Sequence, residues 1–378
     1  MAPIRLGMVG GGNDAFIGGV HRIASRIDDR FDLVAGALSS TPEKSAASAE
    51  ALGIPRSYGS FAEMAEAEAA REDGIEAVAI VTPNHVHAAA AKAFLAKGIH
   101  VICDKPLTAT MEEAADLEAA VAQAQSLFVL THNYTGYPMI RQARAMVAAG
   151  DLGDIRIVQA EYPQDWLTSA VENEGLKQAE WRTDPARSGA GGSVGDIGTH
   201  AHNLACFVSG LKVESLAADL QCWGAGRALD DNAHMMLRFQ GGARGMLWSS
   251  QVAPGNENAL KLRIYGDKGG LEWAQEDPNY LWYTRHGGAK QLLTRNGAGA
   301  NAAAQAVSRI PGGHPEGYLE GFATIYSEAA DAIRAYQGGA ARADAMGQLP
   351  GMADGMAGMK FIQACVTSSA RDAAWVTL

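Results

Sequence analysis

The chain has 378 residues, which is too long for a single typical core and indicates two domains. Hydrophobic residues make up 47% of it, which excludes global disorder, and a formal charge of −11 argues against nucleic acid or an anionic membrane as the main partner. Four widely spaced cysteines, a first strand that leaves no room for a signal peptide and the lack of a long apolar run predict a cytoplasmic protein with free thiols and no membrane span.

The first predicted strand, residues 4–9, runs into a glycine turn that precedes a predicted helix at 16–27. The turn Gly10-Gly11-Gly12-Asn13-Asp14-Ala15 matches the pattern G-x-G-x-x-A. Such a turn lets backbone N–H groups approach a pyrophosphate held at the start of the next helix. The pattern alone is weak, but its position between a strand and a helix supports it. We predict that a dinucleotide contacts Gly10, Gly12, Asn13, Ala15, Phe16 and Ile17.

The next hundred residues alternate between short apolar runs and amphipathic segments. Further strands are predicted at 32–38, 56–58, 77–82, 99–103 and 127–131, and helices at 42–52, 61–70, 87–97 and 111–125. Strands that alternate with helices indicate a parallel sheet with right-handed crossovers. We therefore predict an α/β chain whose residues 1–131 form a Rossmann dinucleotide-binding domain.

Cofactor choice is expected at the end of the second strand. An acidic residue there would bond the ribose of NAD, and an arginine would favour NADP. The chain has Ser39 and Ser40 at this place and Lys44 one turn later, so the cofactor is NAD or NADP and the preference stays open.

The turn after the fourth strand, Thr82-Pro83-Asn84, is expected to flank the cofactor ring and ribose. His85 and His87 follow it. A metal would need further ligands that the neighbouring sequence lacks, so we expect no metal site. Turn capping and hydrogen bonding explain the two histidines better, and His87 is included among the cofactor contacts.

The fifth strand, residues 99–103, ends abruptly at Asp104-Lys105-Pro106. Ligands of open α/β sheets lie just beyond the carboxyl ends of such strands. Pro106 lacks an N–H and disfavours helical geometry at Lys105, so it fixes the exit from the strand. The alternative interpretation is a solvated Asp–Lys pair; the functional one places Asp104 and Lys105 beside the cofactor.

Beyond residue 131 the alternation stops, and residues 132–378 are predicted to form a second, α+β domain. Helices are predicted at 137–149, 199–208, 315–336 and 352–370, the last one free to pack back on the first domain. Strands are predicted at 155–162, 215–222, 233–239, 243–251, 260–265, 270–273 and 280–284. Short turns between them indicate a large, mostly antiparallel open sheet, one face of which is expected to pair subunits into a homodimer or homotetramer.

Two irregular stretches of this domain carry polar residues. Residues 164–182 are aromatic and polar, as expected either for a loop that faces a substrate or for an ordinary surface excursion. Residues 188–198 are rich in glycine and lead into the helix at 199–208. Asp196 and His200 are four residues apart, so they can share a proton network; the alternative roles are a helix cap and a partly buried polar residue. Residues 296–313 are rich in alanine and glycine and predict a mobile loop.

These motifs together resemble the Gfo/Idh/MocA oxidoreductases, the glucose–fructose oxidoreductase and inositol dehydrogenase family. The resemblance spans essentially the whole chain. It includes the glycine turn, Thr82-Pro83-Asn84, Asp104-Lys105-Pro106 in place of Glu-Lys-Pro, Trp181-Arg182, and Gly191-Gly192 through Asp196 and His200.

The resemblance implies catalytic roles. It implies that Lys105 hydrogen-bonds the reacting hydroxyl, that Asp196 orients the substrate, and that His200 is the general acid/base. Asp104 is one methylene shorter than the usual Glu, and Asn203 stands where many members have a second Asp. Polar residues expected to hold a polyol are His132, Tyr134, Asp165, Trp166, Arg182 and Asn203.

The resulting prediction is an NAD(P)-dependent dehydrogenase that oxidises a secondary hydroxyl of a sugar, sugar derivative or inositol. A base must take the hydroxyl proton while hydride leaves for nicotinamide, and a nearby ammonium stabilises the developing alkoxide. Two alternatives remain: an NAD-dependent glycoside hydrolase or lyase that oxidises its substrate transiently, and a non-catalytic dinucleotide sensor.

Overall fold

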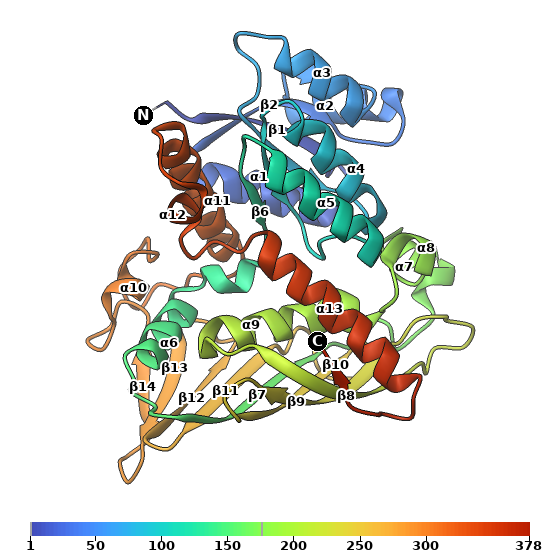
Figure 1. The fold of residues 1–378 in the computed structure, drawn as a ribbon. Coiled ribbons are helices and arrows are strands. Elements are labelled where there is room, and N and C mark those ends of the chain that lie inside the picture. Colours follow the sequence, from blue (N-terminus) through green and yellow to red (C-terminus); the bar gives the residue numbers. More distant parts are fainter. Residues whose placement is uncertain (1, 175–176) are drawn as a thin grey trace. The chain divides into compact units, whose positions relative to one another are not determined.

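The computed structural model describes residues 2–174 and 177–378 and divides into two compact units. The first unit holds the described residues up to Asn133 together with Phe322–Ala357, and the second holds Tyr134–Gly321 and Gly358–Leu378. Each unit is built on one sheet (Figure 1). The expected domain boundary after residue 131 stays a prediction.

The first unit contains, in its described residues, a six-stranded sheet in the order β3-β2-β1-β4-β5-β6, and its pairings are parallel. The order of a doubly wound sheet reverses between β1 and β4, where ligands of this architecture bind. The predicted Rossmann fold is thus confirmed. The strands are β1 (Ile4–Gly10), β2 (Phe31–Ala37), β3 (Arg56–Ser57), β4 (Ala77–Val81), β5 (His100–Cys103) and β6 (Phe128–Leu130).

Helices connect these strands as the alternation predicted. β4 is buried along its whole length, as expected for a parallel strand covered on both faces. A capping box of Thr110 and Glu113 starts α5. Helix α4 begins at Asn84, earlier than expected. Pro83 is the residue that directly precedes this helix, and its ring fixes its φ at −58°, a value compatible with a helix start. The helices are α1 (Phe16–Ile27), α2 (Pro42–Leu52), α3 (Phe61–Ala69), α4 (Asn84–Leu95), α5 (Met111–Gln123) and α12 (Arg342–Met346).

A C-terminal helix completes the first unit. From Phe322 onwards, α11 (Tyr318–Gln337) belongs to this unit. The Phe322 ring lies 4.9 Å from the ring of His21 on α1, and the Tyr326 ring lies 5.4 Å from that of Phe31 on β2. The hydroxyl of Tyr326 lies 2.8 Å from Nδ1 of His21. The unit is therefore assembled from two separate parts of the chain.

The second unit contains, among its described residues, a nine-stranded sheet in the order β14-β13-β12-β11-β7-β10-β9-β8-β15. Among the strand pairs of this sheet in the described residues, only β10 and β7 run parallel, and the other pairs are antiparallel. The prediction of a mostly antiparallel sheet is therefore confirmed. The strands are β7 (Ile155–Pro163), β8 (Val213–Gln221), β9 (Asn232–Phe239), β10 (Arg244–Ser250), β11 (Lys261–Gly266), β12 (Gly269–Ala274), β13 (Tyr280–Arg285), β14 (Gln291–Thr294) and β15 (Val376–Thr377).

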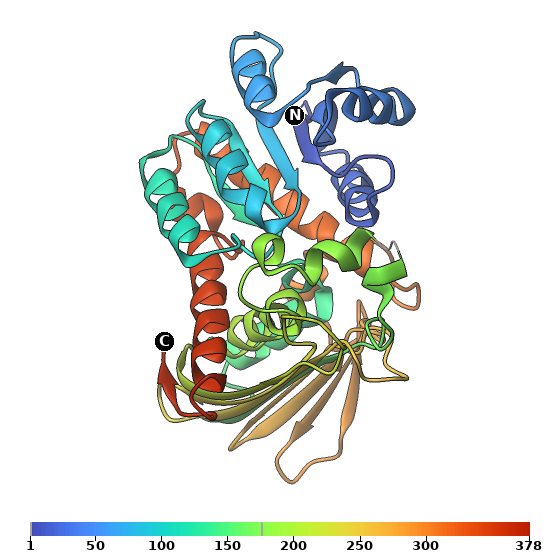
Figure 2. The same ribbon diagram turned by 90° about the vertical axis from the view of Figure 1, so that its right-hand side faces the viewer.

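Helices α6 and α9 lie along one face of this sheet (Figures 1 and 2). Alternate strand residues point to that face and are buried, such as Val158, Leu237 and Leu262. In both views the opposite face, called the outer face below, carries no described helix. It exposes Met236 and Met246, which are cross-strand neighbours. The helical segments are η1 (Asn133–Gly136), α6 (Pro138–Ala148), η2 (Val171–Glu174), α7 (Lys177–Arg182), α8 (Pro185–Ser188), η3 (Val194–Gly198), α9 (Thr199–Ser209), α10 (Ala302–Gln305) and, from Gly358 onwards, α13 (Met352–Ser369).

Two stretches that the sequence predicts as loops contain helical turns. The stretch 164–182 contains η2 and α7, although residues 175–176 lie outside the described residues. The expected mobile loop at 296–313 contains α10, because the Asn301 side chain accepts the N–H of Ala304 at 3.0 Å and its own N–H donates to Gln142 Oε1 at 2.7 Å. Within the described part of the chain, no helix is long and apolar enough to cross a membrane.

Candidate active site

The glycine turn after β1 lies so close to the neighbouring strand ends that a side chain at two of its positions would clash with backbone. Gly10 has a φ of +74°, and a Cβ there would lie 2.4 Å from the Val81 carbonyl oxygen. A Cβ on Gly12 would lie 2.8 Å from the Leu38 carbonyl oxygen. The turn therefore brings bare backbone to the carboxyl ends of β1 and β4 and to the start of α1. Such a cradle fits a diphosphate group.

Residues around the turn hold its shape. The Asn13 N–H donates to Ser48 Oγ at 3.4 Å, and Ala15 directly precedes α1. The guanidinium of Arg22, itself buried, donates to the Gly11 carbonyl oxygen. Phe16 is 64% exposed at the first position of the helix, whereas Ile17 is half-buried. Arg22 and Ser48 are not among the predicted site residues, since nothing in the local pattern separates them from ordinary helix residues.

The turns after β4 and β5 are tied to each other by His87. This side chain is fully buried, with Nδ1 2.9 Å from the Pro106 carbonyl oxygen and Nε2 2.9 Å from that of Thr82. Burial lowers the pKa of His87 below its usual value. His87 therefore braces the two turns that carry Pro83 and Asn84 on one side and Lys105 on the other.

Asp104 shapes the turn that carries Lys105. Its Oδ1 accepts the Lys105 N–H and the hydroxyl of Thr131, both at 2.9 Å. His132 follows that threonine and is also buried. The carboxylate thus fixes the backbone beside Lys105, a role that adds to the cofactor contact expected for it.

The end of β2 presents hydroxyl groups and one amine. Ser39 is half-buried, and Ser40 and Lys44 are exposed. Nearby, Ser45 Oγ accepts the Leu38 N–H at 2.9 Å and donates to the Tyr58 carbonyl at 2.8 Å, which fixes the strand end. These groups can bond a ribose hydroxyl, and Lys44 can pair with a phosphate.

The second unit places Asp196 in a short π-helical turn, η3, that continues into α9. Its Oδ2 accepts from Gln251 Nε2 at 2.9 Å and lies 3.3 Å from Arg182 Nε. The guanidinium of Arg182 in turn lies over the Trp181 ring, 4.5 Å from its centroid. Two partners therefore orient the carboxylate. Gln251 is not among the predicted site residues. It ends a predicted strand at a position whose side chain points toward the buried face of the sheet, and a polar side chain at such a position is a signal for a site.

His200 and Asn203, which are both buried, lie on α9 directly after that turn. The His200 ring packs against two tyrosine rings of the second unit. Its centroid lies 4.9 Å from that of Tyr134, at an interplanar angle of 76°, and 6.2 Å from that of Tyr162. The acid/base candidate is thus held on a rigid helix against an aromatic wall.

The glycine-rich segment before Asp196 is held by a carboxylate that is not among the predicted site residues. Buried Asp230 accepts the N–H groups of Gly192 at 2.7 Å and Val194 at 2.8 Å, and the Ser193 hydroxyl at 2.7 Å. These bonds start η3 within residues expected to be an irregular loop. The sequence around Asp230 carries no pattern that would reveal this role, because its partners lie more than 30 residues earlier in the chain.

Asp165 and Trp166 lie in the segment after β7. The Gly255 N–H donates to Asp165 Oδ2 at 3.1 Å, and the Trp166 ring N–H donates to Gln164 Oε1 at 3.1 Å. Both side chains therefore have partners that fix this segment. Lys105 and the cofactor candidates belong to the first unit, whereas Asp196, His200, Arg182, Tyr134, Asn203, Asp165 and Trp166 belong to the second.

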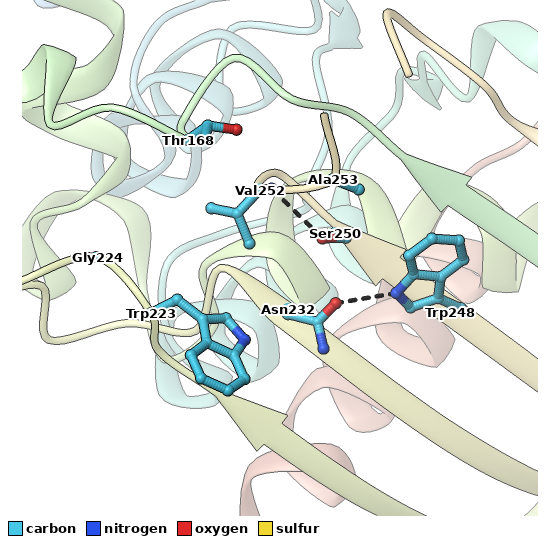
Figure 3. A pocket seen from close by; sticks show the side chains of 8 residues that line it. All are labelled: Thr168, Trp223, Gly224, Asn232, Trp248, Ser250, Val252 and Ala253. Atoms are coloured by element: carbon cyan, nitrogen blue, oxygen red, sulfur yellow. Dashed lines mark hydrogen bonds between the residues drawn. The ribbon is translucent and has the colours of Figure 1, made fainter. Parts of the chain in front are cut away.

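A separate cavity of about 450 Å³ opens at the start of β9 and the end of β10. Figure 3 shows Trp223 and Trp248 on either side of Asn232, whose Oδ1 accepts the Trp248 ring N–H at 2.9 Å. Asn232 and Ser250 are cross-strand neighbours in the same phase as Met236 and Met246, so the cavity belongs to the outer face. It contains none of the predicted site residues. Its lining consists of Thr168, Trp223, Gly224, Asn232, Trp248, Ser250, Val252 and Ala253.

Comparison with known proteins supports one family for both units. Residues 4–134 match the oxidoreductase family with an NAD-binding Rossmann fold, and residues 140–272 match the GFO/IDH/MocA C-terminal domain. An uncharacterized oxidoreductase, YfiI, from Bacillus subtilis is 35% identical, over 99% of this chain and 96% of its own length.

Two solved structures resemble the whole chain. An oxidoreductase from Sinorhizobium meliloti is 60% identical over the full length of both chains, with a TM-score of 0.89. An inositol dehydrogenase homolog from Azotobacter vinelandii, complexed with NADH and myo-inositol, is 34% identical over 100% of this chain and 98% of its own, with a TM-score of 0.92. The chain therefore belongs to the Gfo/Idh/MocA family of NAD-binding oxidoreductases.

Proposed function

We propose that the protein is an NAD(P)-dependent dehydrogenase that oxidises a secondary hydroxyl of a sugar, sugar derivative or inositol. The observation that carries the proposal is the placement of Asp196 and His200 four residues apart on one continuous helical segment, in a chain that also has a glycine cradle for a dinucleotide. The complex of the Azotobacter vinelandii homolog with NADH and myo-inositol supports the same substrate class.

The roles follow from the chemistry of alcohol oxidation. When bound, nicotinamide supplies the acceptor for the hydride. His200 takes the hydroxyl proton, since a neutral imidazole is available near neutral pH. The Lys105 ammonium polarises the hydroxyl and stabilises the charge that develops on oxygen. Asp196, oriented by Gln251 and Arg182, positions the substrate for this proton transfer.

The remaining side chains that the sequence predicts for the substrate keep that role in the proposal. They share hydrogen-bonding groups suited to a polyol and comprise His132, Tyr134, Asp165, Trp166, Arg182 and Asn203. Ser39, Ser40 and Lys44 serve the ribose end of the cofactor, and either NAD or NADP is compatible with them.

The test is a panel of monosaccharides, inositols and glycosides, each with NAD and NADP, followed at 340 nm. Lys105→Ala and His200→Ala should each lower turnover by about two to four powers of ten, the usual range for acid–base catalysis. Matched controls are Lys92→Ala, at a 42% exposed side chain on α4, and the exposed His286→Ala, which should leave turnover unchanged.

The same panel separates the alternatives. Stoichiometric formation of NADH excludes transient oxidation by a hydrolase or lyase, in which no net reduction occurs. Full activity of Lys105→Ala on every substrate would contradict the proposed catalytic role.

We also propose a homodimer or homotetramer that pairs through the outer face. Met236 and Met246 are 53% and 58% exposed there, and the cross-strand pair Trp282 and Leu292 is 41% and 42% exposed. Exposed apolar rows on one sheet face mark a contact surface. Met246→Lys should reduce the mass measured by light scattering to that of a smaller assembly. Ile23→Lys, at an exposed residue of the first unit, is the control and should not change it.

A further inference from the structure

A chain of hydrogen bonds, buried at its start and partly buried beyond it, leads away from the ring that packs against His200. The hydroxyl of Tyr134 hydrogen-bonds to that of Tyr162, and Tyr162 donates to Asn258 Oδ1 at 2.7 Å. An amide oxygen only accepts, and a phenol has a single hydrogen to donate. Tyr134 is therefore the donor to Tyr162, and the chain has one direction.

Asn258 joins this chain to the segment after β7. Gln164 Nε2 donates to the same Oδ1 at 2.7 Å, and Gln164 Oε1 accepts from the Trp166 ring at 3.1 Å. The Asn258 backbone N–H donates to Glu276 Oε1 at 2.9 Å, which anchors the residue itself. Asn258 is thus the junction between the aromatic wall beside His200 and the segment that the sequence predicts to face the substrate.

The two phenols of this chain stay neutral. Burial raises the pKa of Tyr134 to about 12, with a further contribution from the Asp196 carboxylate. Burial also raises the pKa of Tyr162 well above its usual value, and the neighbouring Tyr134 adds to the shift. Neither phenol ionises in the range where an imidazole titrates, so their contribution is geometric.

We propose that Tyr162 and Asn258 are positioning residues for His200, an inference that rests on the proposed function. They hold the Tyr134 ring in place, and that ring fixes the plane of the imidazole through its edge-to-face contact. Neither residue touches the reacting atoms in this role. If the hydroxyl chain is cut, the Tyr134 ring and then the imidazole gain freedom to turn.

The first test compares Tyr162→Phe and Asn258→Leu with Tyr283→Phe. The control removes a hydroxyl from the same sheet that donates to the Asp151 carbonyl at 3.3 Å. The two test variants should lower kcat by about tenfold to a hundredfold, because a displacement near 1 Å has an effect of this size. KM should change less than about threefold. Asn258→Asp, which keeps an acceptor oxygen, should retain more of kcat than Asn258→Leu.

The second test does not depend on activity. The chain has 10 histidines, and the ring resonance of His200 can be assigned in labelled protein by its loss in His200→Gln. Tyr162→Phe should move that resonance and leave those of the exposed histidines unchanged. An unmoved resonance, or a kcat equal to that of the control, would overturn the inference. A moved resonance in a protein whose wild type oxidises no polyol would support the positioning role and refute the proposed dehydrogenase.

Discussion

Replacing Gly12 by alanine tests whether the glycine turn cradles a diphosphate. The new Cβ would lie 2.8 Å from the Leu38 carbonyl oxygen and 2.9 Å from Ser48 Oγ. Contacts of this kind are normally about 3.5 Å, so the turn must move by roughly 0.7 Å. Such a shift removes most of one charge-assisted hydrogen bond, which contributes about 1.5–3 kcal/mol. We expect NAD to bind about tenfold to a hundredfold more weakly.

Isothermal titration with NAD and with NADH measures this change directly. Gly19→Ala is the matched control, because it lies on α1 and its Cβ would meet only Arg22 Nη2 at 3.8 Å, an ordinary contact. The control should bind NAD like the wild type and unfold at a slightly higher temperature, since alanine favours a helix over glycine. If Gly12→Ala bound NAD with unchanged affinity, the turn would not be the diphosphate site.

The side chain of Arg227 is 3% exposed and pairs with Glu172 at 2.8 Å and with Asp231 at 3.2 Å. Arg227→Met should therefore lower the free energy of unfolding by about 3–5 kcal/mol in urea titrations. The exposed control Arg71→Met should change it by less than about 0.5 kcal/mol, and equal losses would contradict the reasoning. Burial lowers the pKa of His202 in the folded protein to about 4, whereas a histidine in the unfolded chain has a pKa of about 6.5. Between these two pH values the unfolded chain binds a proton at His202 that the folded protein does not bind. Stability should therefore fall as the pH drops from about 6.5 to 4. His202→Phe should make that fall smaller without removing it, because burial also lowers the pKa of His21, His87 and His100; identical profiles would refute the burial argument.

Much of the first unit follows from local sequence. Parallel strands that are covered on both faces must be apolar throughout, and the run Ala77–Val81 satisfies this without any long-range information. The glycine turn also carries its signal locally, because strand, turn and helix are consecutive. Helix α4 starts at Asn84 and not at the predicted residue 87, because Pro83 directly precedes the helix. A pattern of a strand followed by a turn does not reveal this.

In the second unit, sequence patterns fail to predict the short strands and the long-range side-chain contacts. Alternation predicts its long strands, but β14 and β15 have four and two residues, too few for a periodic signal. Asp196 and His200 lie within one segment and were found together. Gln251, by contrast, reaches Asp196 from 55 residues away, and such pairs depend on the register of the sheet. Asp230 reaches Val194 across 36 residues for the same reason.

The discontinuous first unit has a consequence for biosynthesis. Phe322 and Tyr326 cover the rings of His21 and Phe31, yet they leave the ribosome only after the Tyr134–Gly321 part of the second unit has been translated. A nascent chain that ends at Asn133 exposes those rings to water. We expect the nucleotide-binding unit to remain incomplete, and prone to aggregate or recruit chaperones, until translation has passed Ala357.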